Sequence, residues 1–256
     1  MPLSNSQLKR TAKQLIRQSK PNVIYVAAIY CVLTIILSIL SSRLIDAGVT
    51  DSRLQWFMTY MDQGSIDQAT QVLLSMMPSG SAVLIYLLLE ASISIVAVGF
   101  NIFLLRTIRR DSPSTGNLLD GFGFFWRILL TSILINLFTV LWGLLLIIPG
   151  IIASYSYSMA LYLLIDHPEY SVMDCIRESK RMMRGHKMEF FLLQLSFIGW
   201  LLLVQLSSLP GMWMLSMVQL WTVPYISMTC ALYYEILRTG SVFLALPGQD
   251  EVPPVI

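Results

Sequence analysis

The sequence predicts an all-α fold, a polytopic membrane helical bundle of about six transmembrane helices with both termini in the cytoplasm. Three observations predict it. Of 256 residues, 55% are hydrophobic and only 12% charged, whereas soluble domains are about 25% charged. About half of the chain lies in apolar stretches long enough, or nearly so, to cross a bilayer. Lysine and arginine gather in alternate connecting segments. The composition therefore argues against a soluble enzyme, a disordered tail and a nucleic-acid-binding domain.

Six apolar stretches form the predicted transmembrane part, residues 23–240. They are Val23–Ser42, Ala82–Leu105, Ile128–Ile148, Ile151–Ile165, Phe190–Ser208 and Met212–Leu237. A crossing needs about 20 residues, and only the fourth stretch, with 15, falls well short of that. The first stretch is too long for the apolar part of a cleaved signal peptide, so it is predicted to be an uncleaved anchor. Pro149-Gly150 and Pro210-Gly211 are the expected breaks between neighbouring stretches.

The orientation follows from the positive charges. Segments 1–22, 106–127 and 166–189 and the tail after residue 237 hold 15 lysines and arginines, while segment 43–81 holds two. The positive-inside rule then places residues 43–81 outside the cytoplasm and the short tail 241–256 inside it. Charge counting leaves two alternatives for residues 128–165, two full crossings or a re-entrant hairpin, because both return the chain to the same side.

The N-terminal segment 1–22 is predicted to be an amphipathic, basic helix. Its apolar face holds Leu8, Ala12, Leu15 and Ile16. Its charged face holds Lys9, Arg10, Lys13, Arg17 and Lys20. We expect the helix to lie on the anionic inner leaflet with its apolar face down. It either only sets the orientation or binds a partner or lipid.

A second amphipathic helix is predicted over residues 171–184 of the cytoplasmic loop. Ser171 and Asp174 form the pattern of a capping box, and Gly185 suits the end of the helix. Arg177 and Arg181 lie on its charged face and are candidates for docking to a partner or to lipid. The alternative is a solvated helix that links two crossings.

Segment 43–81 is too long for a simple turn. Apolar residues recur at helical spacing on either side of Gly64, and Pro78 ends the second run. We expect two short amphipathic helices that rest on the outer leaflet or form a lid over a cavity.

Three polar residues at membrane depth are candidates for a site: Glu90, Asn136 and Gln219. Glu90 has Tyr86 and Ser94 four residues away on either side, so both could hydrogen-bond its carboxyl group. An intramembrane carboxyl suggests proton coupling or contact with a polar substrate. The alternative is a neutral acid satisfied inside the bundle.

Enzyme and metal motifs are not found in the sequence. There is no HExxH, GxSxG, Walker A or GxGxxG pattern. The cysteines Cys31, Cys175 and Cys230 are widely spaced, and Asp166-His167-Pro168-Glu169 is too small a group for a convincing metal site. We therefore expect no catalytic residues, no metal and no cofactor.

Residues 141–200 carry an ordered set of short motifs. They are IIPGI with Pro149 and Gly150, Asp166 in D-x-P, Ser179, Met183 and Gly185 in the amphipathic helix, and Ser196, Phe197, Gly199 and Trp200 in LSFIGW. With the basic LKRTAKQLI at the N-terminus and GFGFFWR before the third stretch, this resembles a family of uncharacterised bacterial multipass membrane proteins, known as a domain of unknown function. The resemblance implies an integral cytoplasmic-membrane protein without an assigned reaction.

The functional expectation is a non-enzymatic scaffold or accessory subunit in envelope processes. Its expected partners are the lipid bilayer, with its anionic inner leaflet, and other membrane proteins, but not nucleic acid. The alternative is a transporter or permease subunit for a small or amphipathic solute, with Glu90, Asn136 and Gln219 along the path.

Overall fold

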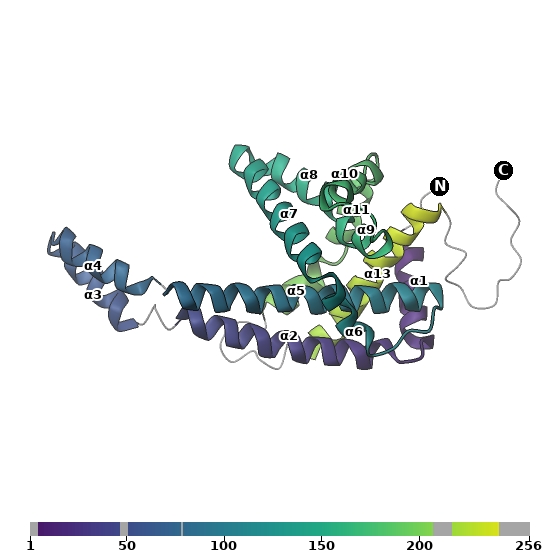
Figure 1. Cartoon of the computed structure of the whole chain (residues 1–256), viewed down its shortest axis with the longest axis horizontal. Coiled ribbons are helices and arrows are strands. Elements are labelled where there is room, and N and C mark those ends of the chain that lie inside the picture. Colours follow the sequence, from purple (N-terminus) through teal and green to yellow (C-terminus); the bar gives the residue numbers. More distant parts are fainter. Residues whose placement is uncertain (1–4, 47–50, 78, 207–216, 241–256) are drawn as a thin grey trace, which may run out of the picture. The chain divides into compact units, whose positions relative to one another are not determined.

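The computed structural model describes residues 5–46, 51–77, 79–206 and 217–240, and their regular structure is helical throughout (Figure 1). The chain divides into two compact units, a small unit of residues 32–94 and a large unit of residues 1–31 and 95–256. The helices are α1 (Asn5–Gln18), α2 (Val23–Asp46), α3 (Asp51–Asp62), α4 (Ile66–Met76), α5 (Gly80–Arg109), α6 (Asn117–Asp120), the 3-10 helix η1 (Gly121–Phe124), α7 (Phe125–Leu145), α8 (Ile147–Tyr157), α9 (Ala160–Asp166), α10 (Val172–Met182), α11 (Lys187–Leu195), α12 (Ile198–Leu206) and α13 (Gln219–Thr239).

Four helical segments of the described chain are long and apolar enough to cross a membrane. They are Val23–Arg43, Gly80–Arg109, Asn117–Leu144 and Ile148–Asp166. The bent pair α11 and α12 makes a fifth if it is one span. The chain is thus a multi-span membrane protein with four to five candidate spans. The sixth predicted stretch begins outside the described residues, and its described part, α13, is not among the candidates.

The break between α7 and α8 lies at Leu146, which is extended at φ −162° and ψ 143°. The prediction of a break at Pro149-Gly150 is wrong, because both residues lie in the first turn of α8, where proline is tolerated. Gly150 instead allows α8 to pack closely against α7. A Cβ atom on Gly150 would lie 2.7 Å from the Cα atom of Gly143 on α7, so only glycine lets the two backbones approach this closely.

The predicted crossing 190–208 is not one straight helix. Its described part consists of α11 and α12, which meet at a bend of 49° around Ser196 and Phe197. The ammonium group of Lys9 donates to the main-chain carbonyl of Ser196 at 3.1 Å and lies 4.1 Å from the centre of the Phe197 ring. Because the break leaves carbonyl groups without helical partners, this contact stabilises the bend. Residues 207 and 208 lie outside the described residues.

The amphipathic helices α1 and α10 form as predicted, but their apolar faces pack inside the large unit. α1 packs on α13, with Leu8, Ala12, Leu15 and Ile16 buried. The prediction that these four side chains face the leaflet is therefore wrong. α10 packs on α7, α8 and α9. Its predicted capping box is confirmed: the Ser171 hydroxyl accepts from the Asp174 amide at 3.2 Å, and the Asp174 carboxylate accepts from the Ser171 amide at 3.3 Å.

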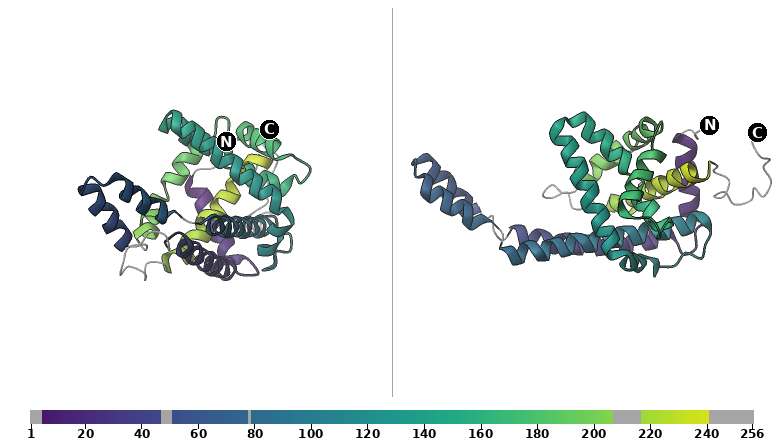
Figure 2. Two further views of the ribbon diagram at one scale, coloured as in Figure 1. Left: turned by 60° about the vertical axis from the view of Figure 1, so that its left-hand side comes forward. Right: turned by 45° about the horizontal axis from the view of Figure 1, so that its top comes forward.

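In the small unit, the two helices predicted within residues 43–81 are confirmed as α3 and α4, which lie side by side (Figure 2). The chain turns between them at Gly64, whose φ is +67°. The Arg53 guanidinium donates to the main-chain carbonyl of Ser75 at 2.9 Å and joins the two helices. Large apolar side chains of both helices, among them Met58 and Leu74, are more than half exposed within the chain.

Candidate functional site

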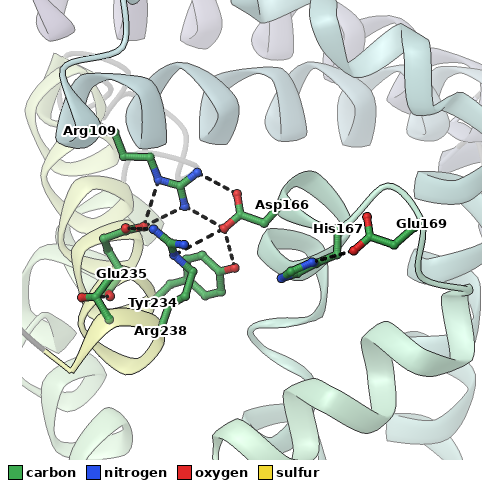
Figure 3. Close-up of polar contacts among 8 residues, drawn as sticks. Arg109, Asp166, His167, Glu169, Tyr234, Glu235 and Arg238 are labelled. Carbon is green, nitrogen blue, oxygen red and sulfur yellow. Dashed lines mark hydrogen bonds and ion pairs between the residues drawn. The ribbon is translucent and has the colours of Figure 1, made fainter.

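Three helix ends of the large unit meet at a cluster of charged side chains (Figure 3). Arg109 lies in the last turn of α5, and Asp166 is the last residue of α9. α13 contributes residues from its last two turns. We call Arg109, Asp166, Tyr234, Glu235 and Arg238 the ion-pair cluster.

Arg109 is at the centre of the cluster. Its Nη1 and Nη2 atoms donate to the two carboxylate oxygens of Asp166 at 2.8 and 2.6 Å. Its Nε and Nη2 atoms also donate to Oε2 of Glu235, at 3.1 and 2.7 Å. One planar guanidinium therefore binds carboxylates from two other helices at once, a geometry that lysine cannot reproduce.

Two residues of α13 complete the cluster. The Tyr234 hydroxyl donates to Oδ2 of Asp166 at 2.8 Å. Arg238 donates to Oε1 of Glu235 through Nη2, and its Nε lies 3.7 Å from Oδ2 of Asp166. Two arginines thus balance two carboxylates, so the cluster carries no net charge.

The carboxylates of the cluster are buried, whereas the arginines reach the surface. The Asp166 and Glu235 side chains are 8% and 5% exposed, against 28% for Arg109 and 38% for Arg238. Buried carboxylates lose their hydration, and only good geometry and matched opposite charge offset that cost. Because each carboxylate already accepts from several donors, the arrangement is suited to holding α5, α9 and α13 together.

An aromatic and amide layer continues the contact between the same helices. Tyr162 of α9 stacks on Tyr234, with ring centres 5.0 Å apart, and its hydroxyl donates to the side-chain oxygen of Asn101 on α5 at 3.3 Å. Polar groups at this depth commonly join helices by hydrogen bonds. This layer therefore supports the helix-joining role of the cluster.

Hydrogen bonds and ring stacking also fix the segment after Asp166. His167 Nδ1 lies 2.8 Å from Oε1 of Glu169, and its ring stacks on Tyr170 at 4.5 Å. Arg127 of α7 donates to the main-chain carbonyls of Pro168 and Tyr170. Hydrogen bonds from the Glu169 amide and from His167 lower the pKa of the Glu169 carboxyl. No group of three potential metal ligands occurs in the described parts of the chain.

The three predicted polar candidates fall in two different units of the chain. Glu90 is half-buried on α5 within the small unit, whereas Asn136 and Gln219 belong to the large unit. Asn136 is exposed on α7, and Gln219 is half-buried at the start of α13. Ser94 donates to the main-chain carbonyl of Glu90 at 3.0 Å and not to its carboxylate. Within the described residues, the Glu90 carboxylate has no hydrogen-bond or ion-pair partner.

The predicted docking cations fall into three groups. Lys9 is used at the bend between α11 and α12, where partial burial lowers the pKa of its ammonium group. Arg177 and Arg181 form ion pairs within α10, with Asp174 at 3.1 Å and Glu178 at 2.7 Å. The remaining four are exposed on or just after α1: Arg10, Lys13, Arg17 and Lys20.

The ion-pair cluster was not predicted from the sequence. Arg109 and Arg238 had served only as markers of orientation, and Asp166 had been considered as a weak metal ligand and as part of the D-x-P motif. A signal was present, because Asp166 directly follows the fourth predicted stretch and Glu235 lies two residues before the end of the sixth, on the side to which the charge count assigns both arginines. Acids and arginines at helix ends on one side are natural partners for ion pairing.

A family described as a protein of unknown function (DUF975) matches residues 143–241. No curated protein and no solved structure matches the chain. The matched range includes Asp166, Tyr234, Glu235 and Arg238 of the ion-pair cluster, while Arg109 lies before it. Over this range the chain is similar to that family, and its candidate spans make it a multi-span membrane protein of unknown function.

Proposed function

We propose that the chain is a non-enzymatic scaffold or accessory subunit of the cytoplasmic membrane, with six crossings and both termini in the cytoplasm. The ion-pair cluster is the observation that carries this proposal. Its charged groups are used to hold helices to one another, as expected of a rigid structural support. The three helix ends that it joins are those that the charge count assigns to the cytoplasm.

The packing of α1 on α13 supports the part of this proposal that puts both termini on the same side of the membrane. A fusion of a reporter to the C-terminus tests this part. Green fluorescent protein after Ile256 should fluoresce, and alkaline phosphatase at that position should be inactive, because the latter folds only outside the cytoplasm. An active phosphatase would overturn the proposed orientation.

One observation favours the transporter alternative. Glu90 is a half-buried acid in a candidate span, and its carboxylate has no partner within the described residues. Unpaired acids at membrane depth are typical of proton paths.

Proton flux into reconstituted vesicles separates the two functions. The full chain, its Glu90→Gln variant and protein-free vesicles would be compared with a pH-sensitive dye trapped inside and a pH gradient applied. A scaffold predicts the same slow acidification in all three. Faster acidification with the wild type, lost in Glu90→Gln, would overturn the scaffold proposal and favour proton-coupled transport.

A further inference from the structure

An open pocket of about 340 Å³ lies where the ends of α1 and α5 meet in the large unit. Its polar lining comes from the two chain segments that end these helices: Gln18, Ser19, Lys20, Thr107, Arg110 and Ser112. None of the described residues that line it is acidic. The volume is at the lower end of the range of ligand pockets, about 300–1,000 Å³.

The pocket has a net positive charge. Lys20 and Arg110 are exposed and form no ion pair within the described residues, whereas the neighbouring Arg106 and Arg109 are both paired. Each helix C-terminus opposes this with roughly half a negative charge. Two full positive charges outweigh two such half charges, so the pocket attracts an anion.

The remaining polar groups suit a phosphate. The Gln18 amide and the Ser112 hydroxyl can donate hydrogen bonds beside the two cations. An arginine fork and a lysine ammonium together match the several acceptor oxygens of a phosphate group. A carboxylate would use fewer of these donors.

The position of the pocket indicates where the phosphate comes from. Lys20 precedes the first candidate span, which begins at Val23, and Arg110 follows the second, which ends at Arg109. The pocket thus lies at the boundary between apolar helix and water, where the phosphates of a bilayer lie. Basic side chains at this level are attracted to anionic lipid headgroups.

We propose that this pocket binds the phosphate headgroup of an anionic phospholipid, with Lys20 and Arg110 as the binding residues. The proposal requires that this end of the large unit lie at a membrane surface. It requires neither a scaffold function nor a particular leaflet, so its failure is distinguishable from a failure of the proposed function.

Native mass spectrometry of the full chain in detergent tests the proposal. Phosphatidylglycerol and phosphatidylcholine would be titrated separately into the wild type, a Lys20→Gln/Arg110→Gln variant and a control Arg10→Gln/Lys13→Gln variant. The control removes the same charge from exposed positions outside the pocket. We expect the wild type and the control to prefer phosphatidylglycerol, and the pocket variant to bind it about tenfold more weakly.

Two outcomes would overturn the proposed lipid site. One is equal affinity of the wild type for both lipids, and the other is an equal loss in the control variant, which would indicate unspecific surface charge. Competition distinguishes the sources of the phosphate. If millimolar inorganic phosphate displaces phosphatidylglycerol completely, the phosphate site stands but the lipid assignment is overturned. A Lys20→Arg variant should keep the affinity, since it keeps the charge.

Discussion

At the scale of single residues, Arg109 is the side chain whose substitution we expect to destabilise the fold most. Its guanidinium satisfies Asp166 and Glu235, which are both buried and come from different helices. Removing one partner of a buried ion pair leaves a buried charge without a counter-charge, which strongly destabilises the fold. The charged groups of the cluster therefore act as one unit, and their contributions should not add.

We expect Arg109→Gln to lower the free energy of unfolding by about 3 kcal/mol, because two buried carboxylates lose their main partner. Thermal unfolding in a single detergent measures it. Arg106→Gln is the matched control, since Arg106 lies 3.8 Å from Asp120 in a pair that is about 40% exposed on both sides. Exposed pairs contribute less than about 1 kcal/mol. Equal shifts in both variants would contradict the structural role of the cluster.

The capping contact of Asp174 predicts that the stability of the fold depends on pH. The hydrogen bond from Ser171 lowers the pKa of the Asp174 carboxyl below its ordinary value of 3.8. A carboxyl whose pKa is lower in the folded state stabilises the fold above its unfolded pKa, and this contribution is lost as the pH falls through the folded value.

The wild type should therefore melt at a higher temperature than Asp174→Asn at pH 6, and the difference should shrink as the pH falls below the ordinary carboxyl pKa of 3.8. Thermal melts at a series of pH values measure this. Glu169 is unchanged in both proteins, so its own titration cancels in the difference. A difference between the two that is independent of pH would contradict the prediction, because it would show that the ionisation of the Asp174 carboxyl does not stabilise the fold.

At the scale of the elements, the contact between α7 and α8 depends on a backbone approach that only glycine permits. Gly150→Ala should destabilise the protein by about 1–3 kcal/mol, because the added methyl group overlaps the backbone of Gly143. Gly143→Ala is the control on the facing helix, where an added Cβ meets nothing within 4 Å. Thermal unfolding of both variants measures the effect. Similar melting temperatures for the two would contradict this packing.

At the scale of the whole molecule, the sequence predicts which segments are helical better than how those helices are used. Apolar length predicted α2, α5 and α7, and the capping pattern predicted the start of α10. These features are local. Other features depend on contacts between helices that are not adjacent to the residue itself. They are the close packing at Gly150, the contact of Lys9 with the bend between α11 and α12, and the partners of Arg109. A pattern along one chain segment does not specify which distant residues make such contacts. The apolar face of α1 therefore predicted a position on the leaflet, whereas it packs on α13.

The hairpin of α7 and α8 carries the last prediction, the choice between two crossings and a re-entrant loop. α7 has 21 residues, and at 1.5 Å per residue it spans about 31 Å, enough for a hydrocarbon core of about 30 Å. The segment Ile148–Asp166 returns with 19 residues. A full crossing in the proposed orientation places Leu146 at the outer surface and Phe122 at the inner one. Both side chains are more than half exposed.

Single cysteines test this in a background without Cys31, Cys175 and Cys230. A membrane-impermeant maleimide added to intact cells should label Leu146→Cys, whereas Phe122→Cys should react only after the membrane is opened. Labelling of Leu146→Cys only in opened cells would mean that the chain dips in and returns on the cytoplasmic side. In that case the chain has fewer full crossings, yet Arg109 and Asp166 still lie on one side, because the ion-pair cluster constrains the ends of the segments and not the depth of the turn between them.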